Sequence, residues 1–332
     1  LFLHSLKHAG TRTRSQWTFA TDWPLERQHS RPLRKGPRSQ LSGRTGLNIR
    51  IGHTPDADDA FMFYGINQGR VDTAGLQVTH ELQPMQQLNR WSLEGKLEMT
   101  AFSFAALAQS FRHYRPIQCG ISLGHGTGPL VVARPETSEA EVKAGLLASP
   151  GDLTSAHWLT QLWSPGQQTR QVRFDQTLES VLSGEMLAAV VIHEGQMSFR
   201  EAGLKLVVDL GAWWAQETGL PIPLGVNGVR RDLSEKIQLQ LAQALHDSIA
   251  LALTEVEEAL DQALPLARGL DRHRCREFVL RYVNQSTLDP GPDGLEAVAE
   301  FYRRAHAAGL TPEPLQLDWV VPITSSEKSS IE

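Results

Sequence analysis

The sequence predicts an α/β fold of two lobes with a ligand-binding cleft between them. Strand-like and helix-like segments alternate from Leu47 onward, which is the pattern of sheets covered by helices. One block of this alternation, residues 135–224, is inserted between residues 47–134 and 225–323, so the chain crosses twice between the lobes. The length of 332 residues suits two lobes of about 100–150 residues each. Two crossovers allow a hinge motion that closes the cleft on a ligand.

Lobe 1 is expected to contain residues 47–134 and 225–323. Apolar spacing and the turn residues between segments predict its elements. The expected strands are 47–53, 77–82, 99–102, 117–123, 129–133 and 226–229, and the expected helices are 58–68, 85–93, 103–111 and several long helices up to residue 308. The loop GHGTG (124–128) is expected to be a hairpin connection, since it lacks the lysine and the following helix of a phosphate-binding loop.

Lobe 2 is expected to contain residues 135–224. Its expected strands are 146–149, 171–174, 188–192 and 206–210, and its expected helices are 154–162, 176–183 and a helical turn at Trp213-Trp214. The two tryptophans are expected to pack in the core beside the hinge, and stacking on a ligand is the alternative. The segment PIPLG (221–225) marks the return to lobe 1.

The composition indicates an ordinary soluble protein. Hydrophobic residues make up 41% and charged residues 21% of the chain. The two cysteines, Cys119 and Cys275, lie far apart and indicate neither a disulfide framework nor a zinc site. No apolar run reaches the roughly 18 residues that a membrane span requires.

The first 46 residues differ from the rest of the chain. They carry nine Lys/Arg and two acids, within a total net charge of −5. They lack sustained periodicity, which is typical of disorder. They could be a basic targeting or nucleic-acid-binding tail, a flexible extension, or translated sequence upstream of the true start, because the chain begins with Leu. We expect an inert, disordered basic extension and no nucleic-acid function. The polar tail 324–332 is expected to be frayed.

His193 is the candidate catalytic residue. It directly follows the apolar run LAAVVI, which predicts a strand of a parallel sheet covered on both faces. Ligands of open α/β sheets bind beyond the carboxyl ends of such strands. An imidazole there is suited to proton transfer near neutral pH. The alternative is a surface or structural histidine, since the chain has 12.

Hydroxyl residues at two helix starts are candidate ligand contacts. Ser103 follows a predicted strand, and it is either a helix N-cap or a hydroxyl that binds a ligand. Thr154 and Ser155 follow the turn SPGD, where free backbone N–H groups could bind a carboxylate. For these two residues, helix capping is again the alternative.

Three acids, Asp56, Asp58 and Asp59, precede the first helix of lobe 1. Asp56 is expected to be an N-cap, and the other two favour the positive end of the helix dipole. A metal site is the less favoured alternative, because no complementary ligand cluster accompanies them. The chain has no G-x-S-x-G motif, and neither cysteine stands in a recognisable cysteine–histidine catalytic motif, which disfavours covalent catalysis.

From about residue 48 to 310, the chain resembles the menaquinone-biosynthesis family of the futalosine route. The segments that carry the resemblance are HTPDADDAFMFYG (53–65), TAFSFAALAQ (100–109), GHGTGPLVV (124–132), SPGDLTSA (149–156), VVIHEGQ (190–196) and VDLGAWWAQETGLPIPLG (208–225). The last two segments are most similar to the 1,4-dihydroxy-6-naphthoate synthase branch. The resemblance implies a two-lobe fold like that of type II periplasmic binding proteins, in an enzyme that works in the cytoplasm.

The resemblance also implies residue roles. It makes His193 the proton acceptor, and it makes Ala101, Phe102, Ser103, Thr154 and Ser155 substrate-binding residues. The implied substrate is cyclic dehypoxanthine futalosine, a small molecule. The implied reaction is a base-initiated ring opening and C–C cleavage that releases dihydroxynaphthoate, with no metal and no other cofactor.

The first motif departs from the family pattern. The synthases commonly have a sequence close to S-P-C-P-N-D-T-F, whereas this chain has T-P-D-A-D-D-A-F at residues 54–61. The added acids would lie near an anionic ligand. Two other functions stay open on sequence grounds: a non-catalytic solute-binding protein, which would need export, and a chorismate dehydratase-like enzyme of the same pathway.

Overall fold

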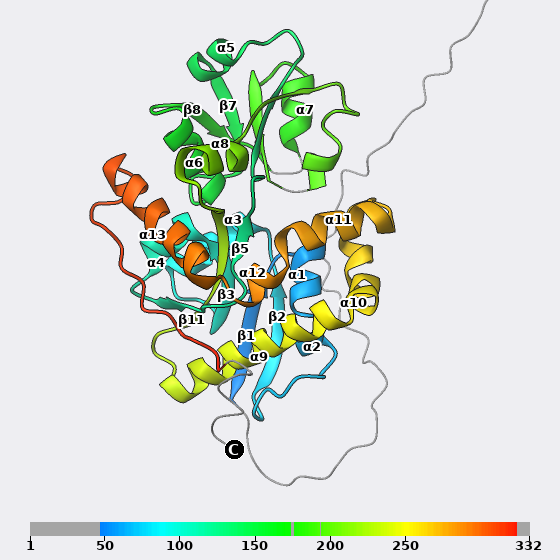
Figure 1. Cartoon of the computed structure of the whole chain (residues 1–332), viewed down its shortest axis with the longest axis vertical. Helices are drawn as coiled ribbons and strands as arrows, with labels where there is room; N and C mark the ends of the chain where they lie inside the picture. Colours follow the sequence, from blue (N-terminus) through cyan, green and yellow to red (C-terminus); the bar gives the residue numbers. More distant parts are fainter. Residues whose placement is uncertain (1–46, 174–175, 193, 324–332) are drawn as a thin grey trace, which may run out of the picture. The chain divides into compact units, whose positions relative to one another are not determined.

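The computed structural model describes residues 47–173, 176–192 and 194–323 (Figure 1). The predicted basic extension 1–46, the tail 324–332 and His193 lie outside the described residues. The described part contains two sheets with helices packed on them, which confirms the α/β fold class. No helix within it has the length and apolar character needed to cross a membrane.

The first sheet has the strand order β2-β1-β3-β11-β4, and β5 also pairs with β11. Its strands are β1 (Asn48–His53), β2 (Gln77–Leu82), β3 (Met99–Ser103), β4 (Tyr114–Pro116), β5 (Ser122–Gly124) and β11 (Ile222–Arg230). β1 is parallel to β2 and β3, whereas β11 is antiparallel to β3, β4 and β5. Because parallel strands end at the same edge, Thr54 and Ser103 are brought to one edge of this sheet.

The second sheet has the strand order β10-β6-β9-β7-β8. Its strands are β6 (Leu130–Ala133), β7 (Leu146–Ser149), β8 (Gln168–Gln171), β9 (Ala188–Val191) and β10 (Lys205–Asp209). All four residues of β9 are buried, as the apolar run predicted. β9 is parallel to β7 but antiparallel to β6, so its sheet is mixed rather than purely parallel.

The prediction of a hairpin at residues 124–128 is wrong. β5 pairs with β11 in the first sheet, whereas β6 pairs with β9 and β10 in the second. GHGTG is therefore a crossing between the sheets, and the strand expected at 129–133 belongs with the inserted block rather than with lobe 1. The strand predicted at 117–123 is also wrong, because the strand there, β5, begins only at Ser122 and ends at Gly124.

Helices cover both sheets. They are α1 (Ala57–Met62), α2 (Tyr64–Asn67), α3 (Met85–Leu93), α4 (Phe104–Ser110), α5 (Glu139–Ala144), α6 (Ser155–Trp163), α7 (Thr177–Leu182), α8 (Leu210–Thr218), α9 (Glu235–Thr254), α10 (Val256–Ala263), α11 (Arg272–Tyr282), α12 (Gln285–Leu288) and α13 (Gly291–Ala307), with 3₁₀ turns at η2 (Glu194–Met197) and η3 (Leu264–Leu266). In Figure 1, α9 runs beside α2 and α10, against which it packs.

The helix predicted at 58–68 is broken between α1 and α2. At this break the hydroxyl of Ser248, in α9, accepts hydrogen bonds from the N–H groups of Gly65 (2.9 Å) and Ile66 (3.3 Å) and donates one to the carbonyl of Met62 (2.9 Å). Ser248 thus satisfies backbone groups that a continuous helix would pair with each other. A contact from 180 residues away cannot be inferred from local periodicity.

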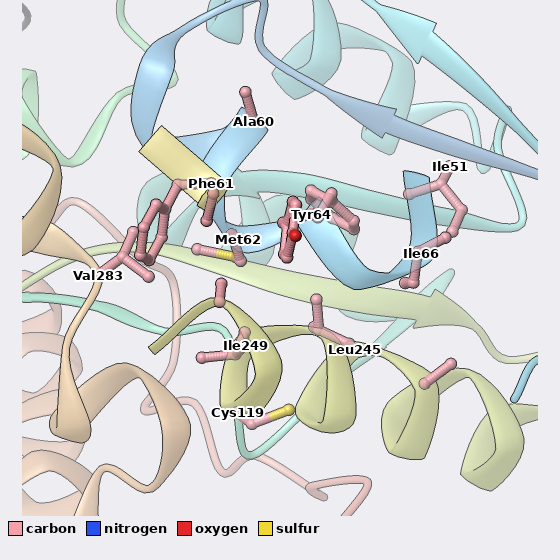
Figure 2. Close-up of a cluster of buried hydrophobic side chains, with 14 of the residues drawn as sticks. Ile51, Ala60, Phe61, Met62, Tyr64, Ile66, Cys119, Leu245, Ile249 and Val283 are labelled. Carbon is pink, nitrogen blue, oxygen red and sulfur yellow. The ribbon is translucent and has the colours of Figure 1, made fainter. Parts of the chain in front are cut away.

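The core of the first lobe lies between α1, α2 and α9. Figure 2 shows the side chains of Met62 and Tyr64 facing Ile249 and Leu245 of α9, with Phe61 beside Val283. The side chains of this cluster are fully or almost fully buried. Burying a large apolar side chain stabilises a fold by roughly 1.5–3 kcal/mol, so this cluster anchors the first turn after β1.

His53, the last residue of β1, forms a hydrogen-bonded pair with His80 of β2. The His53 ring donates from Nδ1 to the carbonyl of Thr54 (3.0 Å), accepts at Nε2 from Nδ1 of His80 (3.0 Å), and stacks on Phe63 with 4.5 Å between ring centroids. Burial lowers the pKa of both imidazoles to about 4, and repulsion between the protonated forms of His53 and His80 makes a smaller contribution to the value of His80. Both rings are therefore neutral at physiological pH.

We expect the free energy of unfolding of the His80→Gln variant to depend less on pH in the acidic range than that of the wild type. The folded-state pKa is lower than the unfolded value near 6.5, so the wild type loses stability as pH falls from about 6.5 to about 4. Over this interval the stability advantage of the wild type over the variant should shrink by about 1–3 kcal/mol. Urea denaturation at several pH values measures it. His273→Gln, at an exposed position in α11, is the control, and equal profiles for both variants would contradict the prediction.

Candidate functional site

A cleft lies where the two sheets meet. It holds about 1200 Å³ of space that includes open solvent. Elements of the first sheet and its helices contribute Thr54, Asp56, Ala101, Phe102, Ser103, Asn227, Arg268 and Tyr282, and elements of the second contribute Pro150, Thr154, Ser155, Ile192 and Gln196. A cleft of this size and mixed lining is suited to a small-molecule ligand.

The cleft contains the five residues that the sequence nominated for substrate binding. Ala101, Phe102 and Ser103 end β3, whereas Thr154 and Ser155 begin α6. His193 is outside the described residues, but Ile192 directly before it lines the cleft, as does Gln196 three residues after it.

Ser103 is held by Asn89 of α3. The Asn89 side chain is fully buried, and its Oδ1 accepts from the Ser103 N–H (2.9 Å). Its Nδ2 donates to the Ser103 hydroxyl oxygen (3.2 Å) and to the carbonyl of Leu153 (3.1 Å). Since the hydroxyl oxygen accepts from Asn89, its own proton remains available to a ligand. Ser103 stands at the N-cap position of α4, but its hydroxyl makes no cap bond, and ligand binding by this side chain stays a prediction.

The hydroxyls of Thr154 and Ser155 form hydrogen bonds to other groups of the protein. Thr154 caps α6 by accepting from the His157 N–H (3.2 Å), and it donates to the carbonyl of Gly151 (2.7 Å). Ser155 donates to the carbonyl of Leu224 (2.6 Å) and accepts from the N–H of Phe104 (3.1 Å). The groups that α6 offers a ligand are therefore the backbone N–H groups of Ser155 and Ala156, which lack intrahelical acceptors and lie at the positive end of the helix dipole.

Gln196, in the HEGQ segment, joins the two halves of the cleft. Its Nε2 donates to the carbonyls of Gly128 and Val191, each at 3.1 Å, and its Oε1 accepts from the Tyr282 hydroxyl at 2.7 Å. Tyr282 ends α11, so this bond links the turn after β9 to the helices of the first sheet. Burial raises the pKa of Tyr282 to about 12, which keeps the phenol protonated as a donor.

The three aspartates after β1 stand at the start of α1 as predicted, with Asp58 and Asp59 in its first turn, but the side chains of Asp56 and Asp59 bond to other partners. Asp56 occupies the N-cap position of α1 but makes no side-chain cap bond, because its carboxylate pairs with Arg268. Asp59 is buried, and its Oδ2 accepts from the N–H (2.6 Å) and hydroxyl (2.8 Å) of Thr54. Burial raises the pKa of Asp59 to about 6. A carboxyl in the cleft lining thus titrates close to neutrality.

The predictions for Trp214, for the two cysteines and for a metal site can also be compared with the structure. Trp214 is fully buried, its Nε1 donates to the carbonyl of Pro221 (3.0 Å), and it packs against Phe301, which confirms a core role. Cys119 and Cys275 are buried and form no disulfide with each other. Within the residues that the structure describes, no group of three or more His, Cys, Asp or Glu is arranged to hold a metal ion.

Sequence reasoning did not nominate Asn89, Gln196, Tyr282 or Arg268. Gln196 had a signal, since it lies in the segment that was singled out for His193. Asn89 stands within a predicted helix, where a polar residue ordinarily faces solvent. Tyr282 and Arg268 come from the helical region near the end of the chain, and only the tertiary fold brings them to the cleft.

Comparisons with known proteins agree on one family. The family model described as menaquinone biosynthesis matches residues 49–307. A Thermus thermophilus protein named 1,4-dihydroxy-6-naphtoate synthase is 41% identical over 271 residues, which are 80% of this chain and 98% of that protein. A Streptomyces coelicolor protein of the same name is 31% identical over 80% of this chain and 95% of its own length.

Solved structures show the same fold. A crystal structure of an Archaeoglobus fulgidus protein superposes with a TM-score of 0.76 at 39% identity and covers 80% of this chain and all of that one. The alkanesulfonate-binding protein of Xanthomonas axonopodis pv. citri superposes with a TM-score of 0.61 at 11% identity, over 84% of this chain and 99% of its own. This second likeness shows that the chain has the periplasmic-binding-protein fold.

We expect Asn89→Ala to lower the free energy of unfolding by about 2–4 kcal/mol. The change leaves the Ser103 N–H and the Leu153 carbonyl without their partner in a buried place. Urea denaturation measures the loss. Asn67→Ala, at an exposed position, should change stability by less than about 0.5 kcal/mol. A similar small effect for both variants would show that Asn89 is replaceable.

We expect Tyr282→Phe to lower the free energy of unfolding by about 1–2 kcal/mol, because Gln196 Oε1 loses its donor inside the protein. Thermal and urea denaturation report the change. Tyr64→Phe is the matched control, since the Tyr64 hydroxyl bonds to the partly exposed pair Arg70–Glu255. If the two variants lose equal stability, the buried bond to Gln196 contributes no more to the free energy of unfolding than the bonds of the Tyr64 hydroxyl.

Proposed function

Because this chain belongs to the menaquinone biosynthesis family, we propose that it is an enzyme of that pathway and that it forms 1,4-dihydroxy-6-naphthoate. The observation that carries the proposal is the 41% identity to a synthase of that name over 98% of the relative's length. The family model matches residues 49–307, a range that contains the described residues lining the cleft. Relatives named as enzymes also disfavour a non-catalytic solute-binding protein.

The proposed reaction is a lyase reaction on cyclic dehypoxanthine futalosine. A base removes a proton, the sugar-derived ring opens, a C–C bond breaks, and the dihydroxynaphthoate separates from a small sugar-derived fragment. His193 is the proposed base. Its support is the family resemblance of the HEGQ segment and the presence of Ile192 and Gln196 in the cleft lining. An imidazole has a pKa suited to this step near neutral pH.

The carboxylate of the substrate is proposed to bind between β3 and α6. The Ser103 hydroxyl has a proton to donate, because Asn89 already donates to its oxygen. The first-turn N–H groups of α6 at Ser155 and Ala156 add donors at the positive end of a helix dipole. These groups bind an anion without a formal positive charge nearby.

The proposed setting is the cytoplasm, as for the family that the sequence resembles. The proposed partner is the small-molecule substrate, and neither nucleic acid nor membrane insertion enters the proposal. The residues named above act through proton transfer, hydrogen bonding and positioning.

We expect His193→Ala to reduce turnover of cyclic dehypoxanthine futalosine by about 10²–10⁴-fold, the usual contribution of a general base. Release of dihydroxynaphthoate, followed by chromatography, measures the rate. Binding of the product should change little, because the carboxylate contacts remain. His273→Ala, at an exposed position, is the control variant.

Two outcomes separate the parts of this proposal. Undiminished turnover by His193→Ala would show that another group is the base, while leaving the assigned reaction intact. Absence of turnover and of product binding in the wild type would contradict the assigned reaction itself.

A further inference from the structure

An ion pair, Asp56–Arg268, lies in the cleft lining and takes no part in the contacts assigned so far. Its members are 212 residues apart in the sequence. Their side chains are 21% and 30% exposed, so the pair is largely buried but remains accessible from the cleft. Asp56 follows β1, and Arg268 lies between η3 and α11.

Arg268 is held in an unusual backbone conformation. Its φ is +50°, in the left-handed region that side chains other than glycine rarely adopt, and Gly269 after it has a φ of +86°. The adjoining turn is closed by hydrogen bonds from the N–H of Ala267 to the carbonyl of Leu264 and from the N–H of Leu270 to the carbonyl of Ala267. Strained residues that the surrounding structure holds in place are concentrated at ligand-binding sites.

The cleft has a charged side and an uncharged side. The charged side follows β1 and carries Asp56, Asp58 and Asp59, and Arg268 is the one Lys or Arg among the described lining residues. The uncharged side follows β3, where α6 is bonded to Phe104 and Leu224 and presents N–H groups. Three acids against one base disfavour an anion on the first side, whereas the helix start favours it on the second.

A buried acceptor without a partner lies on the same charged side. Within the described residues, Oδ1 of Asn227 has no hydrogen-bond partner, although Asn227 is only 2% exposed and lines the cleft. Its Nδ2 donates to the carbonyl of Gly120 (2.9 Å) and contacts the sulfur of Met62 in α1 (3.4 Å). An acceptor of this kind calls for a donor such as a hydroxyl.

We propose that the Asp56–Arg268 pair recognises the hydroxyl-bearing, sugar-derived part of the substrate, while the α6 side binds the carboxylate of the aromatic part. The inference rests on the proposed function and adds the orientation of the substrate. A hydroxyl both donates and accepts, so a carboxylate beside a guanidinium complements a pair of hydroxyls. The proposal also explains Asp56, which departs from the S-P-C-P-N-D-T-F pattern. Arg268 balances its charge, and together they bind the hydroxyls.

The test compares substrate with product, because the product lacks the sugar-derived part. Arg268→Gln and Asp56→Asn should each lower kcat/KM for the substrate at least about tenfold, the effect of a lost charge-assisted hydrogen bond. The Kd of the product, 1,4-dihydroxy-6-naphthoate, should stay within about twofold. Ser103→Ala should instead weaken both substrate and product. Arg272→Gln, which removes a surface ion pair with Glu257 and Asp261, is the control.

Two other outcomes would contradict the proposal, one for the orientation of the substrate and one for the role of the ion pair. Equal weakening of product binding by Arg268→Gln would mean that Arg268 binds the carboxylate, which reverses the orientation. Unchanged kinetics, with only a lower melting temperature, would mean that the pair is structural. In both cases a wild type that turns over the substrate leaves the proposed function standing, whereas a wild type that neither reacts nor binds product overturns that function and this inference together.

Discussion

The position of α6 relative to β3 depends on the hydroxyl of Ser155. This one group donates to the carbonyl of Leu224 and accepts from the N–H of Phe104, so it joins the inserted block to two elements of the first sheet. The N–H of Phe104 begins α4 and would otherwise lack a partner in the protein interior. Because both bonds converge on one oxygen, the first turn of α6 is fixed beside Ser103, and the two groups proposed to bind a carboxylate lie together.

The remaining bonds of the cleft extend this constraint to its other walls. Asn89 ties Ser103 to the Leu153 carbonyl just before α6, and Gln196 ties the turn after β9 to Tyr282. Each uses a buried amide that bonds through both its oxygen and its nitrogen. An amide bonded in this way has a defined orientation, because exchanging its oxygen and nitrogen would break the bonds. These neutral hydrogen bonds therefore hold the walls of the cleft in place.

The sequence predicted the local elements well and the long-range contacts poorly. β1, β2, α3 and β9 follow from apolar periodicity, and so do the position of Ser103 at a strand end and that of Thr154 at a helix start. The crossing at 124–128 was missed because a glycine-rich loop between two strands has the same local pattern whether the strands pair or separate. The Ser248 contact and the Asp56–Arg268 pair were missed because their partners are more than 180 residues apart.

Ionisation of Asp59 links the charged side of the cleft to pH. His53 at the end of β1 and His80 in β2 are neutral in the folded protein near neutral pH, because burial lowers the pKa of both to about 4. Asp59 changes charge near pH 6, since burial raises its pKa above the unfolded value. Its neutral form therefore stabilises the fold below about pH 4, and this contribution is lost as pH rises through about 6. Above that pH, Asp59 adds a negative charge beside Asp56 and Asp58, which makes this side of the cleft less favourable for an anion.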